Sequence, residues 1–290
     1  MSRLLRLALC QTVSDIASEG VDPRPANLAR AEGLIRRAAA EGANLALFGE
    51  VYLNGYRSDA FLRDYSTTID PPDEHVRRLT ELSRETGVYI AMGISRRGPA
   101  FPGNLFNSAI LVGPDGVLGH YDKVHVANFA LPSGRLVLEG VYWDIGRHFR
   151  VFDLPWARVG LQICRDVRYP EASRQLTLMG AEVIINLSAA AAVRTDSWQY
   201  FALTRATENQ AWFAMTSVVG TQKDDELFGG SRVISPTGEQ VGRATDNQED
   251  FRVVDLDLDE VTKLRAMSHV LDRRVPSAYW AITAPLEAEQ

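Results

Sequence analysis

Apolar runs of strand length constrain the fold of this chain more than any other feature. They lie at residues 5–11, 44–50, 88–94, 107–112, 159–163, 181–188, 211–219 and 251–256. Segments with helical spacing of apolar residues separate several of them, at residues 27–42, 74–87, 171–179 and 198–209. Short apolar runs are typical of buried strands, and their alternation with helices is typical of α/β proteins. No break in composition marks a linker, so we predict a single α/β domain over residues 1–290, with two sheets packed on each other and helices outside.

Two local patterns predict further details. Residues 113–116 read Gly-Pro-Asp-Gly, a strong turn sequence that predicts a β-hairpin between the runs at 107–112 and 117–121. Asn27 has a side chain suited to an N-cap, so we expect the first helix to begin there and to end at Gly42.

Charge and composition exclude several classes of function. The chain has 31 Lys and Arg against 37 Asp and Glu, a net charge of −6, which is not the footprint of a nucleic-acid-binding protein. Its apolar runs fall short of the roughly 18 residues that a membrane span needs. Two cysteines, Cys10 and Cys164, imply no disulfide framework. Because residues 4–10 lack a signal-peptide pattern and a free thiol suits a reducing compartment, we expect a cytoplasmic protein that binds neither nucleic acid nor membrane.

Cys164 lies where a buried strand is expected to end and the chain to turn sharply. The apolar run 159–163 precedes it, and the helix-like segment 171–179 follows after a charged turn. Such a turn exposes a side chain and points backbone N–H groups towards it. A lone free cysteine is more often a packed core residue, which is what we expect of Cys10. Cationic neighbours such as Arg165, however, lower the pKa of a thiol, so we interpret Cys164 as a candidate nucleophile.

The turn after Cys164 also carries a family resemblance. Residues 164–171 read Cys-Arg-Asp-Val-Arg-Tyr-Pro-Glu, which resembles the nucleophile region of the nitrilase superfamily of carbon–nitrogen hydrolases. The resemblance implies a four-layer α-β-β-α sandwich of two packed sheets with outer helices. It also implies a catalytic triad of glutamate, lysine and cysteine, usually with a second glutamate, and a homodimer or a larger homo-oligomer.

The resemblance assigns an acid and a lysine upstream of Cys164. Glu50 ends a buried run as Phe-Gly-Glu with Gly-Tyr soon after, as in the family, although the family commonly has proline where this chain has Gly49. Lys123 lies in Tyr-Asp-Lys-Val-His at the end of the expected hairpin, which is similar to the lysine region of the family. Taken alone, Glu50 and Lys123 would be interpreted as solvated residues. We expect His125 to form structural hydrogen bonds rather than to act in catalysis.

The second glutamate of the family lies between the lysine and the cysteine, shortly before a Gly-x-x-Phe lead-in to a strand. Glu139 is the single acid in the loop expected at 128–141, and Gly-Arg-His-Phe follows it at residues 146–149. The resemblance therefore assigns Glu139. Asp144 is the nearest rival, but the family often has a turn residue at that place.

These residues have the chemistry to cleave an amide together. Glu50 can accept the thiol proton, and Lys123 can stabilise an oxyanion with the backbone N–H of Arg165, while Glu139 holds the lysine. The resemblance implies attack of Cys164 on an amide, release of ammonia or an amine, and hydrolysis of the thioester to a carboxylic acid. The histidines lack the spacing of metal ligands, and no Gly-rich phosphate loop follows a strand, so we expect no metal and no cofactor.

Four further residues are candidates for substrate contacts. The resemblance places Ala189, in the small-residue segment 189–194, on the wall of the pocket. Tyr56 lies in the loop that follows Glu50, the expected general base. Arg165 and Arg194 could each hold a substrate carboxylate through a bidentate pair. Pairing of these arginines with an acid of the protein is equally consistent with the sequence.

A small-molecule linear amide is the leading interpretation of the substrate, and an N-carbamoyl amino acid or amine is the alternative. N-Carbamoyl-D-amino-acid hydrolases typically have two adjacent arginines after the cysteine, whereas this chain has Val167 and Arg168. Nitrilases typically have Trp-Glu there, where this chain has Arg165-Asp166. A nitrilase, an acyltransferase and a non-catalytic binding protein are therefore more remote. Residues 260–290 are expected to form a C-terminal extension at a subunit interface.

Overall fold

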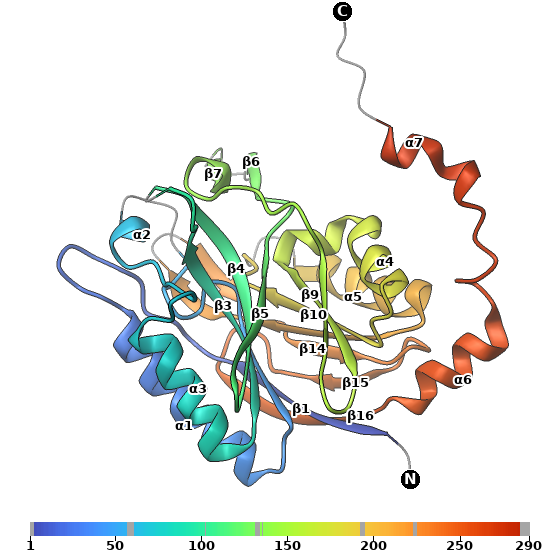
Figure 1. Cartoon of the computed structure of the whole chain (residues 1–290), viewed down its shortest axis with the longest axis horizontal. Coiled ribbons are helices and arrows are strands. Elements are labelled where there is room, and N and C mark those ends of the chain that lie inside the picture. Colours follow the sequence, from blue (N-terminus) through green and yellow to red (C-terminus); the bar gives the residue numbers. More distant parts are fainter. Residues whose placement is uncertain are drawn as a thin grey trace, which may run out of the picture.

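Two six-stranded sheets form the centre of the part of the chain that the structure describes (Figure 1). The computed structural model describes residues 3–56, 61–101, 103–130, 134, 136–191, 195–222 and 225–284. The first sheet has the order β16 (Asp250–Asp257), β1 (Leu4–Gln11), β2 (Leu45–Phe48), β3 (Tyr89–Arg97), β4 (Leu105–Gly113) and β5 (Gly116–Asp122). The second has the order β15 (Gln240–Arg243), β14 (Arg232–Ile234), β11 (Trp212–Ser217), β10 (Val183–Ser188), β9 (Arg158–Ile163) and β8 (Arg150–Asp153).

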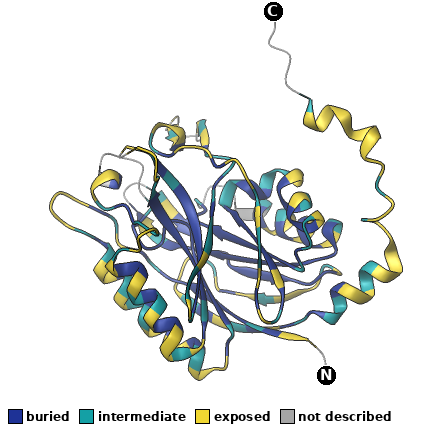
Figure 2. Ribbon diagram, viewed as in Figure 1, coloured by how far each residue is buried: buried dark blue, intermediate teal, exposed yellow. Residues whose placement is uncertain are grey.

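Helices cover the outer face of each sheet (Figure 1). The helices α1 (Arg24–Ala40) and α3 (Glu74–Thr86) cover the first sheet, and α4 (Pro170–Leu178) and α5 (Thr195–Asn209) cover the second. Each helix turns an apolar side inward, as with Ile35 of α1, Leu79 of α3 and Ala202 of α5, while its outer side is exposed (Figure 2). The predicted four-layer α-β-β-α sandwich is confirmed.

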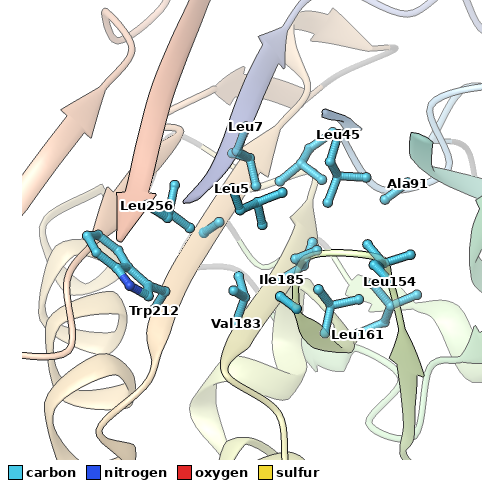
Figure 3. Close-up of a cluster of buried hydrophobic side chains, with 14 of the residues drawn as sticks. Leu5, Leu7, Leu45, Ala91, Leu154, Leu161, Val183, Ile185, Trp212 and Leu256 are labelled. Carbon is cyan, nitrogen blue, oxygen red and sulfur yellow. The ribbon is translucent and has the colours of Figure 1, made fainter. Parts of the chain in front are cut away.

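Aliphatic side chains from both sheets make the core between them (Figure 3). Leu7 and Leu45 of the first sheet pack in one cluster with Leu161 and Ile185 of the second, and all four are fully buried. Burying one such side chain stabilises the fold by about 1.5–3 kcal/mol relative to leaving it exposed. This apolar interface sets the position of one sheet against the other, and therefore the position of residues that follow strands in different sheets.

The central strands of each sheet are parallel, so their carboxyl ends lie together at one edge. In the second sheet Ile163 pairs with Leu187, which places the residues that follow β9 and β10 side by side. The first sheet reaches the same edge, because the N–H of Glu50 donates to the carbonyl of Ser188 at 3.0 Å. The carboxyl ends of parallel strands are a common place for functional sites in α/β proteins.

Helix α1 begins one turn earlier than the sequence predicts, and Asn27 lies inside it rather than at its N-cap. Pro25 occupies the first turn, where its missing N–H costs no hydrogen bond. The buried amide of Asn27 instead binds the backbone N–H and carbonyl of Asp15, at 2.7 and 2.9 Å, and donates to the carbonyl of Leu53 at 3.1 Å. The N-cap prediction is therefore wrong, because this side chain serves contacts between segments.

Short elements lie around the sandwich. They are α2 (Phe61–Asp64), β6 (Asn128–Ala130), β7 (Leu136–Leu138), the 3₁₀ turns η1 (Glu139–Val141) and η2 (Cys164–Arg168), β12 (Val219–Gln222) and β13 (Asp225–Phe228). Between Asn128 and Leu138, where we predicted a loop, β6 and β7 pair as a small antiparallel ladder. In the described part of the chain, no helix has both the length and the apolar character to cross a membrane.

After β16 the chain leaves the sandwich. The helix α6 (Asp259–Ser268) buries Val261 against the core, whereas η4 (Pro276–Tyr279) and α7 (Trp280–Thr283) extend away from the sheets (Figure 1). Figure 2 shows this end of the chain as largely exposed, and Trp280 is 72% exposed. The subunit interface at residues 260–290 stays a prediction, and residues 285–290 lie outside the described part.

Candidate active site

Glu50 follows β2 and lies inside the sandwich, where it is 1% exposed. The preceding residue, Gly49, passes so close to the second sheet that a Cβ would lie 2.6 Å from the N of Val218 and 2.7 Å from the O of Ser188. A side chain at position 49 would therefore push the strand end away. Glycine lets Glu50 enter the interface between the sheets, so the alternative interpretation as a solvated loop residue is excluded.

The predicted hairpin of β4 and β5 brings Lys123 to Glu50. The N–H of Lys123 donates to the carbonyl of Asn107 at 2.8 Å, which continues the hairpin pairing beyond β5. Lys123 Nζ lies 2.6 Å from Glu50 Oε1, and Asn107 Nδ2 donates to the same oxygen at 2.8 Å. The other oxygen, Oε2, accepts from the N–H of Ala189 at 3.0 Å. These contacts hold the Glu50 carboxylate in one orientation.

Glu139 binds the other side of Lys123. Both of its carboxylate oxygens lie 2.9 Å from Lys123 Nζ, and it is fully buried in the turn η1. Tyr56 donates its hydroxyl to Glu139 Oε1 at 2.6 Å, and the N–H of Ala127 donates to Oε2. Asp144, the rival acid, is exposed and contacts an asparagine side chain instead. The structure thus brings Glu50, Lys123 and Glu139 together in one buried cluster.

Cys164 occupies the first position after β9, in a backbone conformation that few non-glycine residues adopt. Its φ is 38°, in the left-handed region, which costs about 1–3 kcal/mol. The side chain is partly exposed, and the carbonyl accepts a hydrogen bond from Asn186 Nδ2 at 3.4 Å. The N–H of Ala189, which binds Glu50, also lies against the thiol. A strained turn that holds a thiol beside the buried cluster is the feature most suggestive of function.

Asp166 ties the turn of Cys164 to the segment of Lys123. Its buried carboxylate accepts hydrogen bonds from the hydroxyl of Tyr121 at 2.7 Å and from the N–H of Ile163 at 2.8 Å. It also accepts from the N–H of His125 at 3.1 Å and lies 2.8 Å from His125 Nδ1. The structural role predicted for His125 therefore matches its contacts.

Burial and charge set the protonation of the cluster. Burial raises the pKa of Glu50; the Lys123 ammonium opposes this shift, and Glu139 adds to it. Burial alone would lower the pKa of Lys123, but the carboxylates of Glu139 and Glu50 outweigh it, so the pKa of Lys123 is raised. Burial raises the pKa of Cys164 well above its usual range, with Glu50 acting in the same direction. At neutral pH the site therefore holds a charged lysine and a neutral thiol.

The residues predicted to bind substrate lie in different environments. Tyr56 is half-buried and binds Glu139, and Ala189 is 7% exposed and binds Glu50 through its N–H. Arg165 is half-buried, with its guanidinium 5.1 Å from the ring centroid of Phe129. Arg194 lies outside the described residues. Among the residues that are described, no group of three or more His, Cys, Asp and Glu side chains is arranged to hold a metal ion.

Sequence reasoning missed the contact of Asn107 with Glu50 and the central position of Asp166. Asn107 begins the apolar run predicted at 107–112 and is fully buried in β4, so a polar residue in a predicted buried strand was the available signal. Asp166 lies in the motif that carries the resemblance, but its partners Tyr121 and His125 are more than 40 residues away in the chain, with separations of 45 and 41.

Comparison with known proteins identifies the family of this chain. A family model described as carbon–nitrogen hydrolase matches residues 6–266. A protein named "Nitrilase" from Pyrococcus abyssi is 33% identical over 80% of this chain and 84% of its own length. "Omega-amidase NIT2" of Bos taurus is 30% identical over 94% of this chain and 96% of its own. "N-carbamoylputrescine amidase" of Arabidopsis thaliana is 29% identical over 92% and 93%.

A solved structure shows the same fold. The amidase from Nesterenkonia sp. AN1, as a double mutant in complex with acrylamide, has a TM-score of 0.81 and 22% sequence identity, covering 96% of this chain and 97% of that chain. The resemblance inferred from residues 164–171 is thus confirmed by a family match over most of the chain. The protein belongs to the carbon–nitrogen hydrolase family, in the nitrilase superfamily, and is an enzyme of that class.

Proposed function

We propose that this enzyme hydrolyses the C–N bond of a small linear amide through a thioester on Cys164. The observation that carries the proposal is the position of the Cys164 thiol beside a buried cluster in which Lys123 joins Glu50 and Glu139. Such a cluster offers a base, a fixed positive charge and a nucleophile in one place. Relatives named as amidases support the same reaction class.

In the first half of the reaction, the Sγ of Cys164 attacks the carbonyl carbon of the amide and the thiol proton passes to Glu50. The carbonyl oxygen becomes an oxyanion as the C–S bond forms. When the oxyanion collapses, the C–N bond breaks and Glu50 gives the proton to the departing nitrogen. Ammonia or an amine leaves, and the acyl group stays on Cys164 as a thioester.

In the second half, water attacks the thioester carbon while Glu50 accepts one of its protons. The C–S bond breaks, Glu50 returns the proton to the sulfur, and a carboxylic acid leaves. The raised pKa of Glu50 suits a group that must both accept and donate a proton. Because the pKa of Cys164 is also raised, the thiol keeps its proton until a substrate is in place.

Lys123 supplies the positive charge for the oxyanion. A lysine ammonium has three donors. One N–H faces Glu50 and one is shared between the two oxygens of Glu139, so a third can meet the oxyanion together with the backbone N–H of Arg165. Loss of one donor of this kind typically lowers the rate by about 10²–10³.

A second candidate is hydrolysis of an N-carbamoyl compound, which one named relative favours. The same residues would act on a ureido carbonyl. An acyltransferase would pass the thioester to an amine in place of water.

The deciding experiment measures ammonia release from small amides, ω-amides, N-carbamoyl amino acids and nitriles, beside a Cys164→Ala variant. We expect amide turnover by the wild type, none by the variant, and a wild-type acyl adduct by mass spectrometry after acid quench. Adding hydroxylamine should divert the acyl group to a hydroxamate. Turnover that persists in Cys164→Ala would overturn the thioester mechanism, and turnover of N-carbamoyl compounds alone would favour the second candidate.

A further inference from the structure

The carboxylate of Asp166 lies between the segments that carry the two proposed donors to the oxyanion. One donor is the backbone N–H of Arg165, in the turn η2 that follows β9 of the second sheet. The other is Lys123, which follows β5 of the first sheet. Donors carried by different sheets keep a fixed spacing only if contacts join their segments, and catalytic rates are sensitive to such spacing.

On the side of the nucleophile, Asp166 fixes the shape of the turn η2. Its Oδ2 accepts a hydrogen bond at 2.8 Å from the N–H of Ile163, the last residue of β9. This bond joins the third residue of the turn to the residue that precedes the turn, as the acidic side chain of a capping box does. Because Arg165 lies inside the closed turn, the contact sets the direction of its N–H.

On the side of the lysine, the same carboxylate binds both flanks of Lys123. Tyr121, two residues before the lysine, donates its hydroxyl to Asp166 Oδ2 at 2.7 Å. His125, two residues after it, donates its N–H to Oδ1 at 3.1 Å, and its Nδ1 lies 2.8 Å from the same oxygen. The hydroxyl of Tyr121 also accepts from the N–H of Val124 at 3.1 Å. The backbone is therefore held on either side of Lys123.

These contacts are well protected from water. Asp166 and Tyr121 are fully buried, which strengthens the hydrogen bond between them. Burial raises the pKa of Tyr121 well above its ordinary value, and the Asp166 carboxylate adds to the shift, so the hydroxyl keeps the proton that it donates. The ring of His125 also stacks on Tyr169, at the end of η2, with 3.6 Å between the ring centroids. The stacking joins the same two segments a second time.

We propose that Asp166 and Tyr121 are positioning residues, which set the Lys123 ammonium and the N–H of Arg165 at the spacing that the oxyanion requires. This inference rests on the function proposed above. Both side chains are fully buried, so they act through the two donors rather than on the substrate. Because a misplacement of about 1 Å can lower a rate by about 10²-fold, loosening these contacts should slow formation of the oxyanion.

Tyr121→Phe tests the proposal, because it removes the hydroxyl and keeps the ring in the core. We expect kcat for propionamide to fall by about 10- to 100-fold with KM within about threefold, since the lost stabilisation belongs to the transition state. Asp166→Asn should lower kcat further, because its amide turns an acceptor into a donor that faces other donors. A kcat within about threefold of the wild type in Tyr121→Phe, or a loss through KM alone, would overturn the proposal.

The reactivity of the Cys164 thiol distinguishes displaced donors from a collapsed site. Methyl methanethiosulfonate transfers its methylthio group to the sulfur: an S–S bond forms, methanesulfinate leaves, and no carbonyl oxygen takes up charge. Labelling measured by mass spectrometry, with Cys164→Ala as background, should therefore stay within about threefold of the wild type in Tyr121→Phe. A loss of labelling that matches the loss of kcat would show general distortion and would overturn the positioning role.

Tyr89→Phe is the matched control. Tyr89 packs against the same apolar cluster as Tyr121, and its hydroxyl forms no hydrogen bond among the described residues. It begins β3, which runs parallel to β2, so it lies at the edge of the sheet opposite to Glu50. This variant should keep the wild-type kcat. Equal losses in Tyr89→Phe and Tyr121→Phe would mean that removing any core hydroxyl slows turnover, which contradicts the proposal.

The outcomes separate this inference from the proposed function. If the wild type hydrolyses propionamide and Tyr121→Phe keeps its kcat, the positioning role is wrong while the amidase stands. If the wild type hydrolyses no amide, propionaldehyde still tests the donors, because it can add to the thiol of Cys164 as a hemithioacetal whose oxygen takes the place of the oxyanion. Protection from labelling that weakens about 10-fold or more in Tyr121→Phe supports the inference. A smaller change, or no protection in the wild type, overturns it.

Discussion

Lys123 and Glu50 form a fully buried ion pair, with 2.6 Å between Lys123 Nζ and Glu50 Oε1. The same ammonium lies 2.9 Å from both oxygens of Glu139, so one positive charge serves two carboxylates. Buried charges add little net stability because of their desolvation, yet removing one partner is costly. The cluster therefore behaves as a unit, in which each change affects both folding and turnover.

Replacement of Lys123 by methionine tests that coupling. Because two carboxylates would lose their common partner, we expect Lys123→Met to lower the free energy of unfolding by about 3–5 kcal/mol and to abolish turnover. Urea denaturation followed by circular dichroism measures the first, and ammonia release the second. Cys164→Ala is the control, since it should abolish turnover with a change in stability of at most about 1 kcal/mol. Wild-type stability in Lys123→Met would contradict the buried pair.

Tyr56→Phe tests whether the Tyr56 hydroxyl holds the Glu139 carboxylate in position for turnover. The substitution removes the hydroxyl that donates to Glu139 Oε1 at 2.6 Å and keeps the ring, so we expect kcat/KM to fall about 10-fold while the fold is retained. Tyr142→Phe is the matched control: Tyr142 packs against the same apolar cluster, and its hydroxyl forms no hydrogen bond among the described residues. Equal losses in the two variants would mean that the Tyr56 hydroxyl has no special role.

The pH dependence of turnover should report the raised pKa of Glu50. Glu50 acts as a base, so kcat/KM should fall as the pH drops through that pKa, with the midpoint above the ordinary value of 4.5. The contribution of Glu50 to the stability of the fold has the opposite pH dependence. A carboxyl whose pKa is raised by folding favours the folded state below its unfolded pKa, and this contribution is lost as the pH rises through the folded pKa.

Asn107→Asp should move that midpoint. Asn107 Nδ2 lies 2.8 Å from Glu50 Oε1, so an aspartate there places a second negative charge beside the base and raises its pKa further. We expect the acid limb of the pH profile of kcat/KM to shift to higher pH. Asn107→Ser, which adds no charge, controls for loss of the hydrogen bond. A profile that stays in place in Asn107→Asp would show that Glu50 is not the titrating base.

The thiol of Cys164 should stay protonated in the free enzyme. Its pKa is raised by burial and by Glu50, so no thiolate should form between about pH 6 and 9. The ultraviolet thiolate absorbance of the wild type should match that of Cys164→Ala over this range. A titration step below about pH 8 that the variant lacks would reveal a preformed thiolate and would contradict proton transfer to Glu50 during attack.

Several features were predictable because they depend on local sequence. The hairpin of β4 and β5 follows from a Gly-Pro-Asp-Gly turn between two apolar runs, and the strand before Cys164 follows from its unbroken apolar character. The helix at Glu74–Thr86 matches its predicted range closely because Asp73 caps it and Gly87 ends it in the left-handed conformation. In these segments the chemistry that starts and stops an element lies within a few residues of it.

Other features needed contacts between distant segments. Asn27 has the side-chain chemistry of an N-cap residue, but its amide group forms hydrogen bonds with the backbone of Asp15 and Leu53. The helix therefore starts a turn earlier. The polar character of Asn107 in a predicted buried strand does not show which residue it binds, because its partner Glu50 is 57 residues away in the chain. The hydrogen bond from the hydroxyl of Tyr121 to Asp166 likewise depends on the packing of one sheet on the other.

The sequence by itself determined the periodicity of the elements, the sharp turn at Cys164, and a short set of chemically suitable residues that included Glu50, Lys123 and Glu139. Periodicity and turn chemistry are local, so they can be read from one stretch of chain. Only the tertiary structure decided that a lysine 73 residues from Glu50 is buried against it, and that Arg165 forms no ion pair with an acid among the described residues. Those outcomes depend on how two sheets pack, because an ion pair at 2.6 Å is set by side chains that different strands bring together.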